Sequence, residues 1–97
     1  MTKAQNTVLI LSDEHNRNMA GCYGHPFVKT PQIDALADRG TRFGAAYCNS
    51  PICVPARAAL ATGRYVHKIR CWDNAMPYHG QYPSWHHVIR ESGREVA

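Results

Sequence analysis

The chain has 97 residues, of which 44% are hydrophobic and 19% charged, and its formal net charge is +4. This composition is typical of a globular chain and excludes a disordered one. The basic residues are scattered, without the Lys/Arg block or aromatic-basic repeat of a nucleic-acid surface, so no nucleic-acid partner is expected. The early apolar run at residues 8–11 is too short for a signal-peptide core or a membrane span. With Met1 as the translation start, we therefore expect a cytoplasmic protein with no membrane partner, whose cysteines are reduced.

Residues 7–11 form a short apolar run with β-branched members, which predicts a buried strand of a parallel sheet. Asp13 and Glu14 follow directly after this run. Ligands of open α/β sheets gather beyond the carboxyl ends of the strands, and hard divalent cations prefer carboxylate oxygens. The two acids are therefore candidate metal ligands. The alternative is that they cap the turn or helix that follows.

Residues 16–28 contain two glycines and a proline, which predicts an irregular loop. Thr30 and Pro31 then predict the start of a helix, because threonine is a good N-cap and proline is tolerated at the first helical position. Gly40 predicts the end of this helix. Its role is packing, and we expect Asp34 to face solvent.

Residues 41–48 alternate loosely between apolar and polar side chains, which predicts a short strand leading through a turn to the sequence C-V-P-A-R. Pro55 suits the first turn of a helix and Gly63 suits the position just past its end. We therefore expect Cys53 at or just before a helix N-terminus. Arg57 follows one turn later on the same face. An anion bound there would meet free backbone N–H groups, the positive end of the helix dipole and a guanidinium.

The region after this helix contains Asn74, whose amide can donate a hydrogen bond to a bound anion without adding charge. The alternative for Asn74 is a role in a turn formed by an Asp-Asn pair. A loop is predicted for residues 76–83 and a helix for Ser84–Gly93. Cys48 and Cys71 are expected to be small buried apolar residues.

The block C-x-P-x-R, followed by a short helix and Thr-Gly-Arg, resembles the signature of the formylglycine-dependent sulfatases, in the alkaline phosphatase superfamily. Two earlier blocks agree in the same order: G-C-Y-G at residues 21–24 and T-P-x-I-D-x-L-A at residues 30–37. The choline-sulfatase, arylsulfatase and phosphonate monoester hydrolase branches are the most similar. The resemblance implies an α/β fold, with residues 1–97 as the N-terminal part of an alkaline-phosphatase-like α/β/α sandwich with a mostly parallel sheet. Sulfatases of this type are several times longer, so the chain is expected to be an incomplete catalytic domain that is inactive by itself.

The same resemblance implies a sulfuric ester hydrolase. Cys53 would be oxidised by a formylglycine-generating enzyme to formylglycine, whose hydrated aldehyde is the nucleophile. One hydroxyl attacks the sulfur of a small-molecule sulfate ester as the alcohol departs, and the second then collapses to the aldehyde and expels sulfate. Asp13, Glu14 and the modified Cys53 would hold a divalent metal, with Ca²⁺ expected first and Mn²⁺ or Mg²⁺ as alternatives. Arg57 would stabilise the transferred group, and Asn74 would help to orient it.

Two other interpretations stay open. A phosphonate monoester or phosphodiester hydrolase would use the same nucleophile. These esters have the shape of a sulfate ester and would be bound by the same residues. A non-catalytic chain, in which Cys53 remains a thiol, would have no activity. An oligomer is compatible with either interpretation of the full-length protein.

Overall fold

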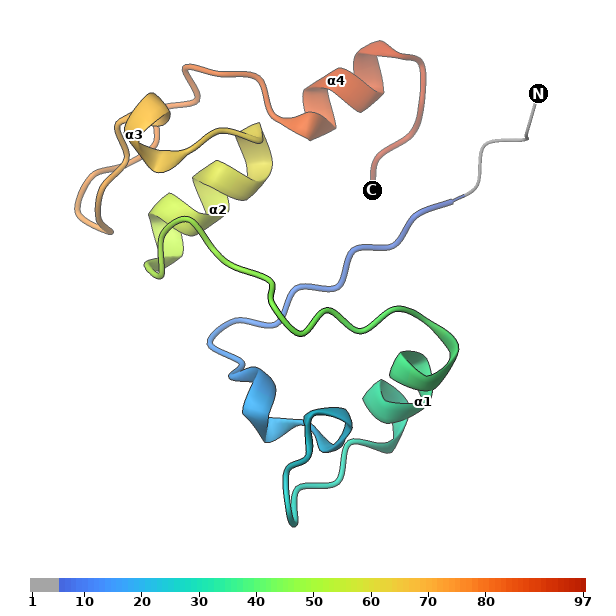
Figure 1. The fold of residues 1–97 in the computed structure, drawn as a ribbon. Coiled ribbons are helices and arrows are strands. Elements are labelled where there is room, and N and C mark those ends of the chain that lie inside the picture. The colour runs from blue at the N-terminus through green and yellow to red at the C-terminus, as the bar shows by residue number, and fades with distance from the viewer. Residues whose placement is uncertain (1–5) are drawn as a thin grey trace. The chain divides into compact units, whose positions relative to one another are not determined.

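The structure is a computed structural model that describes residues 6–97. Met1, on which the expected cytoplasmic location depends, lies outside the described residues. The chain divides into two compact units, Met1–Gly44 and Ala45–Ala97. Helices account for all the regular structure of the described part: η1 (Arg17–Met19), η2 (Gly21–Tyr23) and α1 (Pro31–Arg39) in the first unit, and α2 (Cys53–Thr62), α3 (Val66–Ile69) and α4 (Trp85–Glu91) in the second (Figure 1). No helix within residues 6–97 has the length and apolarity needed to cross a bilayer.

The two predicted strands do not form in the described part of the chain. Residues 7–11 run as an extended trace without strand pairing (Figure 1). Val8 and Ile10 are 82% and 86% exposed, and Leu9 and Leu11, which alternate with them, are 59% and 60% exposed. Residues 41–48 are also without strand structure. A strand is held by hydrogen bonds to a neighbouring strand, and residues 6–97 supply no such neighbour, so an apolar run alone does not produce one here.

Helix α1 begins and ends where the sequence predicts. Pro31 is its first residue, Thr30 precedes it, and Gly40 follows its last residue. A Cβ at Gly40 would lie 3.0 Å from the Leu36 carbonyl oxygen, so a side chain at this position would crowd the end of the helix. The local signals of a first-turn proline and a terminal glycine are therefore sufficient to fix this helix.

Asp34 does not face solvent as the sequence suggests; it is half-buried and joins α1 to the loop before it. Its Oδ1 accepts hydrogen bonds from the Cys22 backbone N–H at 2.7 Å and from the Thr30 hydroxyl at 2.8 Å. The Thr30 hydroxyl oxygen in turn accepts from the Gly21 N–H at 2.8 Å. These bonds hold η2 against the first turn of α1. The carboxylate of Asp34 is needed on this face of the helix because it accepts two of them.

Gly21→Ala is predicted to destabilise the full-length protein. A Cβ at Gly21 would lie 2.5 Å from Asp34 Oδ2, so Asp34 would have to move away from its two donors. We expect a loss of about 1–3 kcal/mol in the free energy of unfolding, measured by urea denaturation. Gly44→Ala is the matched control, because a Cβ at Gly44 meets no atom within 4 Å. Equal stability of the two variants would contradict the role assigned to Asp34.

Tyr23 holds the end of the first unit. Its hydroxyl donates to the Phe43 carbonyl at 2.9 Å, and the guanidinium groups of Arg17 and Arg42 lie 5.8 and 5.3 Å from its ring centroid. Arg17 also donates to the Gly44 carbonyl, and Arg42 to the Cys22 carbonyl. Residues 42–44 lie in the segment predicted as a strand, and these side-chain hydrogen bonds hold them in place without strand pairing.

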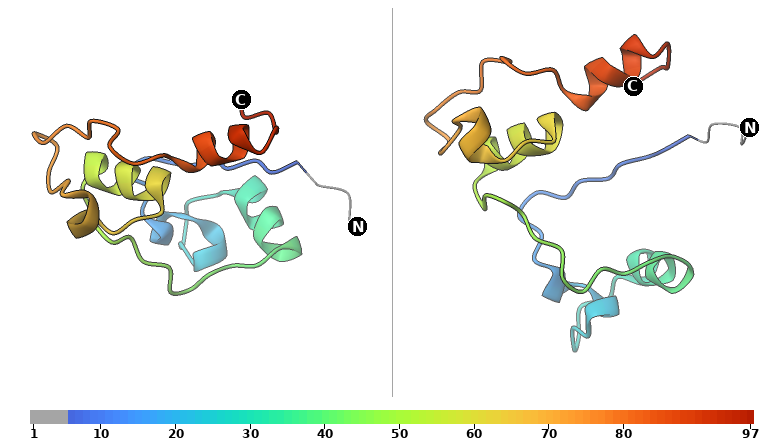
Figure 2. Two further views of the ribbon diagram at one scale, coloured as in Figure 1. Left: turned by 90° about the horizontal axis from the view of Figure 1, so that it is seen from above. Right: turned by 45° about the horizontal axis from the view of Figure 1, so that its top comes forward.

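The second unit is built on the contact between α2 and α3. Ala58 of α2 packs with Ile69 and Cys71 in a buried cluster, which Val54, Tyr78 and Tyr82 partly cover. Figure 2 shows α2 and α3 side by side in both views. Cys71 is therefore the small buried residue that the sequence predicts, whereas Cys48 is exposed and donates its S–H to the Ser50 carbonyl.

The loop at residues 76–83 is ordered by its own polar groups. The Tyr78 hydroxyl accepts from the Tyr82 N–H at 2.9 Å and donates to the Tyr82 carbonyl at 3.0 Å. The Gln81 amide donates to the Ile69 carbonyl at 3.1 Å, which ties the loop to α3. Helix α4 then starts after Ser84, as predicted, with a capping box between Ser84 and His87.

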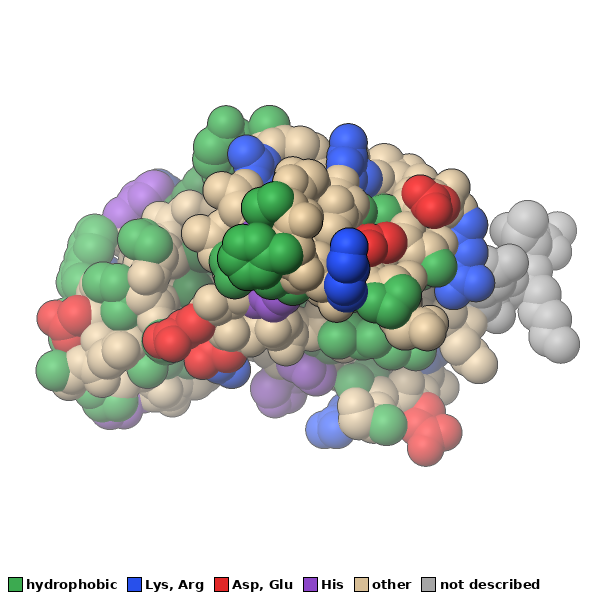
Figure 3. Space-filling model, turned by 90° about the horizontal axis from the view of Figure 1, so that it is seen from below, with side chains coloured by type: hydrophobic (Ala, Val, Ile, Leu, Met, Phe, Trp, Pro, Cys, Tyr) green, Lys and Arg blue, Asp and Glu red, His purple; other side chains and the backbone are tan. Residues whose placement is uncertain are grey.

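Large apolar side chains reach the surface in both units, and many appear in green in Figure 3. Among residues 6–97 the buried apolar residues are few and mostly small: Ala20, Pro55, Ala58, Ala59, Ile69 and Cys71. Apolar burial scales with the size of the folded unit, so such small cores give little stabilisation. Measurements of stability and activity therefore belong in the full-length protein.

Candidate active site at the head of helix α2

Cys53 is the first residue of α2, as the sequence predicts. The preceding residue, Ile52, has an extended backbone with φ −124° and ψ 138°, and Pro55 lies in the first turn. Gly63 ends the helix with φ 65°, and its N–H donates to the Ala59 carbonyl at 2.9 Å. A left-handed residue is accommodated here because it is glycine.

One face of α2 is buried and the other presents polar groups. Pro55, Ala58 and Ala59 are buried, whereas Cys53 is half-buried and Arg57 is exposed. Residues four apart lie on the same side of a helix, so the thiol and the guanidinium share one face. Small buried residues let α2 pack closely on α3 and leave this second face for chemistry.

Asn74 contacts the head of α2. Its Oδ1 accepts a hydrogen bond from the Val54 backbone N–H at 2.9 Å, across twenty residues of sequence. The turn that carries Asn74 is shaped by Asp73, whose Oδ1 accepts from the N–H groups of Ala75 at 2.7 Å and Met76 at 3.0 Å. The structure confirms the turn interpretation: the Asp-Asn pair forms a turn that brings Asn74 to the residue after Cys53. The contact of Asn74 with a substrate stays a prediction.

The backbone of α2 offers fewer donors to an anion than the sequence suggests. Pro55 has no N–H, the Val54 N–H donates to Asn74, and the Ala56 N–H donates to the Ile52 carbonyl at 2.9 Å. Because Val54 is already bonded and Pro55 has no N–H, the start of α2 has fewer free N–H groups than the sequence predicts. Anion binding at this helix rests on side chains, and Arg57 is the cation on the relevant face.

Asp13 and Glu14 lie in a turn of the first unit, and both are exposed. Glu14 has a left-handed backbone with φ 52°. The side chain that caps η1 is Asn16, whose Oδ1 accepts from the Asn18 N–H at 2.9 Å, so the capping alternative for the two acids does not hold at η1. Two adjacent carboxylates are the hard oxygen donors that suit Ca²⁺, Mg²⁺ or Mn²⁺, so the donor chemistry fits a divalent cation.

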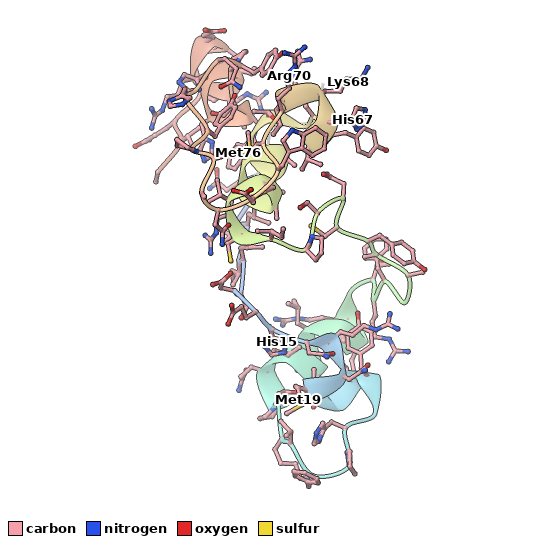
Figure 4. The ribbon with its side chains drawn as sticks, turned by 90° about the vertical axis from the view of Figure 1, so that its left-hand side faces the viewer. His15, Met19, His67, Lys68, Arg70 and Met76 are labelled. Atoms are coloured by element: carbon pink, nitrogen blue, oxygen red, sulfur yellow. The ribbon has the colours of Figure 1, made fainter. Side chains whose placement is uncertain are left out.

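His67, which precedes Asn74 by seven residues, lies on the surface of a helix. His67 belongs to α3, is exposed, and stacks on Tyr65 with ring centroids 5.6 Å apart. Figure 4 shows His67 and Lys68 projecting from α3, with Arg70 at its end. Arg70 ends α3 with a left-handed backbone at φ 53°. These observations place His67 on the surface of α3.

Comparison with known proteins gives consistent matches. The Sulfatase family model matches residues 5–91. The chain is 38% identical to arylsulfatase K of Homo sapiens over 91 residues, which are 94% of this chain and 17% of that protein. It is 29% identical to N-acetylglucosamine-6-O-sulfatase of Bacteroides thetaiotaomicron over 96 residues, 99% of this chain and 17% of that protein. It is 43% identical to the uncharacterized sulfatase YidJ of Escherichia coli over 72 residues, 74% of this chain and 14% of that protein. No solved structure matches the chain significantly.

The chain belongs to the Sulfatase family, because the family model covers residues 5–91. Membership implies an α/β fold, to which the described residues contribute helices and no strand. Sulfatases are generally dependent on formylglycine and on a metal. The chain spans 17% of the length of arylsulfatase K and of N-acetylglucosamine-6-O-sulfatase.

Proposed function

We propose that residues 1–97 are the N-terminal part of a sulfatase catalytic domain, and that the full-length protein hydrolyses sulfate monoesters of small molecules. The observation that carries this proposal is the position of Cys53 as the first residue of α2, with Arg57 one turn later on the same face. Family membership and the names of the relatives support it.

The nucleophile in this proposal is formylglycine made from Cys53 by a formylglycine-generating enzyme. A thiol that attacked sulfur would form a thiosulfate with no easy route to release. A hydrated aldehyde supplies one hydroxyl for attack and a second for release of sulfate. Cys53 is half-buried at the head of a helix, which restricts the directions from which an ester can approach.

Asp13, Glu14 and the modified Cys53 are the proposed metal ligands, with Ca²⁺ as the first candidate and Mn²⁺ or Mg²⁺ as alternatives. When bound, a divalent cation acts as a Lewis acid that offsets charge on the sulfuryl oxygens. Both carboxylates belong to one turn, so they reach a cation from adjacent positions in the chain. Their hard oxygens suit such an ion better than the scattered cysteines do.

Arg57 and Asn74 complete the proposed site. The guanidinium of Arg57 carries a fixed positive charge and can donate two parallel hydrogen bonds to a sulfate group. Because the Asn74 oxygen faces the Val54 N–H, the Asn74 NH₂ group is the part left to donate to the substrate. The two side chains thus supply the donors that the α2 backbone largely lacks.

The function is tested with the full-length protein and two nitrophenyl esters, the sulfate and the phenylphosphonate. A sulfatase prefers the sulfate by kcat/KM. A preference for the phosphonate would reassign the site to a phosphonate or phosphodiester hydrolase with the same nucleophile. Absence of both activities in a folded protein would favour the non-catalytic interpretation.

Metal removal is predicted to abolish the activity. Treatment of the full-length protein with EDTA and dialysis should lower kcat by at least about 100-fold, because the charge on the sulfuryl oxygens is then left uncompensated. Addition of Ca²⁺ should restore it in the wild type. In Asp13→Asn the same addition should restore much less, because a charged ligand is missing. Full activity after exhaustive chelation would contradict the metal site.

A further inference from the structure

Helix α2 begins without a local cap. Its N-cap residue is Ile52, whose side chain makes no capping hydrogen bond and belongs to a poorly capping residue type. The first N–H groups of a helix have no intrahelical acceptor, so a partner must come from elsewhere. Asn74 supplies one, because its Oδ1 accepts from the Val54 N–H at 2.9 Å.

We propose that Asn74 caps α2 from a distant loop and thereby positions Cys53 for reaction. The role in reaction rests on the proposed function, whereas the capping contact stands on the structure alone. Val54 directly follows Cys53, so loss of the contact loosens the turn that carries the nucleophile. A displacement of about 1 Å at a reacting group can lower a rate by about 100-fold. Asn74 in this role is a positioning residue.

The loop that carries Asn74 is anchored on both sides. Cys71 is 2% exposed and packs against Ala58 of α2 and Ile69 of α3. The Cys71 S–H donates to the Met76 carbonyl at 3.7 Å, so the same buried residue holds the far end of the turn. Asp73 closes the turn with its bonds to two backbone N–H groups. Asn74 is therefore presented to α2 by an ordered turn.

The test compares Asn74→Ala with Asn74→Asp in the full-length protein. Alanine has no acceptor for the Val54 N–H, whereas a carboxylate accepts it and also suits the positive end of the helix dipole. Asn49→Ala is the matched control, because Asn49 Oδ1 accepts from the Val66 N–H at 3.4 Å and so contacts the start of α3 instead. The measurements are residue-resolved hydrogen exchange at Val54, and kcat and KM for nitrophenyl sulfate.

Asn74→Ala should speed exchange at Val54 by at least about fivefold and lower kcat by at least about tenfold, in addition to any rise in KM caused by loss of the NH₂ donor. Asn74→Asp should keep the wild-type exchange rate at Val54, and Asn49→Ala should match the wild type in both measurements. If Asn74→Ala does not fold, Asn74→Asp keeps the proposal falsifiable, because fast exchange at Val54 in that variant would contradict it.

Unchanged exchange at Val54 in Asn74→Ala, or fast exchange in Asn74→Asp, would overturn the proposal. A rise in KM alone would also overturn it, since that pattern belongs to a residue that only binds substrate. Equal effects in Asn49→Ala would show a general loosening of the unit. If the wild type hydrolyses no sulfate ester, the proposed function fails, and exchange at Val54 still decides whether Asn74 caps α2.

Discussion

Replacement of Cys53 by alanine should lower kcat/KM for nitrophenyl sulfate by at least about 10⁴-fold, because removal of a covalent nucleophile leaves only binding and electrostatic stabilisation. Alanine is the best helix former, so α2 should persist with its first residue changed. Circular dichroism and the midpoint of urea unfolding should therefore match the wild type. The loss of activity can then be assigned to chemistry and not to unfolding.

Cys48→Ala is the control for this experiment. Cys48 lies five residues before Cys53, is exposed, and donates only to the Ser50 carbonyl. Its replacement should change kcat/KM by no more than about twofold, as is usual for exposed sites. If Cys53→Ala kept activity within about tenfold of the wild type, Cys53 would not be the nucleophile.

Replacement of Arg57 by alanine should have the second largest effect, a fall in kcat of about 100- to 1000-fold. The reason lies in the first turn of α2, where two N–H groups are already bonded and Pro55 has none. The guanidinium therefore carries most of the stabilisation of the transferred group that this helix can give. Arg57→Lys should recover only part of the activity, because an ammonium group cannot make two parallel hydrogen bonds.

Arg64→Ala is the matched control for Arg57. Arg64 follows the other end of α2 and lies over the Tyr82 ring at 4.4 Å from its centroid. Its loss removes the same charge just beyond the far end of this helix, away from Cys53. Equal losses in kcat for the two variants would mean that the general positive field matters and that Arg57 has no specific role.

The three longer helices, α1, α2 and α4, could be predicted from the sequence because their signals are local, whereas the one-turn helix α3 and the 3-10 turns η1 and η2 were not predicted. Pro31 and Gly40 bound α1, Cys53 and Gly63 bound α2, and in each case the feature acts within one turn of the residue that carries it. Helix α4 ends two residues before the predicted Gly93, which has φ 80° and follows the C-cap Ser92. Even that difference lies within one turn.

The strands could not be predicted with the same success, because a strand depends on its neighbours. The apolar run at residues 7–11 matches the pattern of a buried strand, yet its side chains are exposed and its backbone is unpaired in the described part of the chain. Family membership implies a sheet, and the proposed remainder of the domain would have to provide the pairing strands.

Two polar contacts, one at the site and one in the first unit, could also not be predicted from the sequence. The bond between Asn74 and Val54 joins residues twenty apart, and Asp34 binds Cys22 across twelve residues. Such contacts depend on how loops fold back, for which no short-range spacing rule exists. The pair D-N at residues 73–74 predicts a turn, but it does not tell which helix the turn meets. The residues of the site were thus predicted individually, and their mutual geometry was not.

Conversion of Cys53 into the sulfatase nucleophile can be measured directly by mass spectrometry of the tryptic peptide of residues 43–57 from the native host. This peptide contains both Cys48 and Cys53, so alkylation gives an internal control. We expect one alkyl group, on Cys48, and the mass of an aldehyde in place of the thiol at Cys53. Two alkyl groups, with an intact thiol at Cys53, would contradict the formylglycine mechanism.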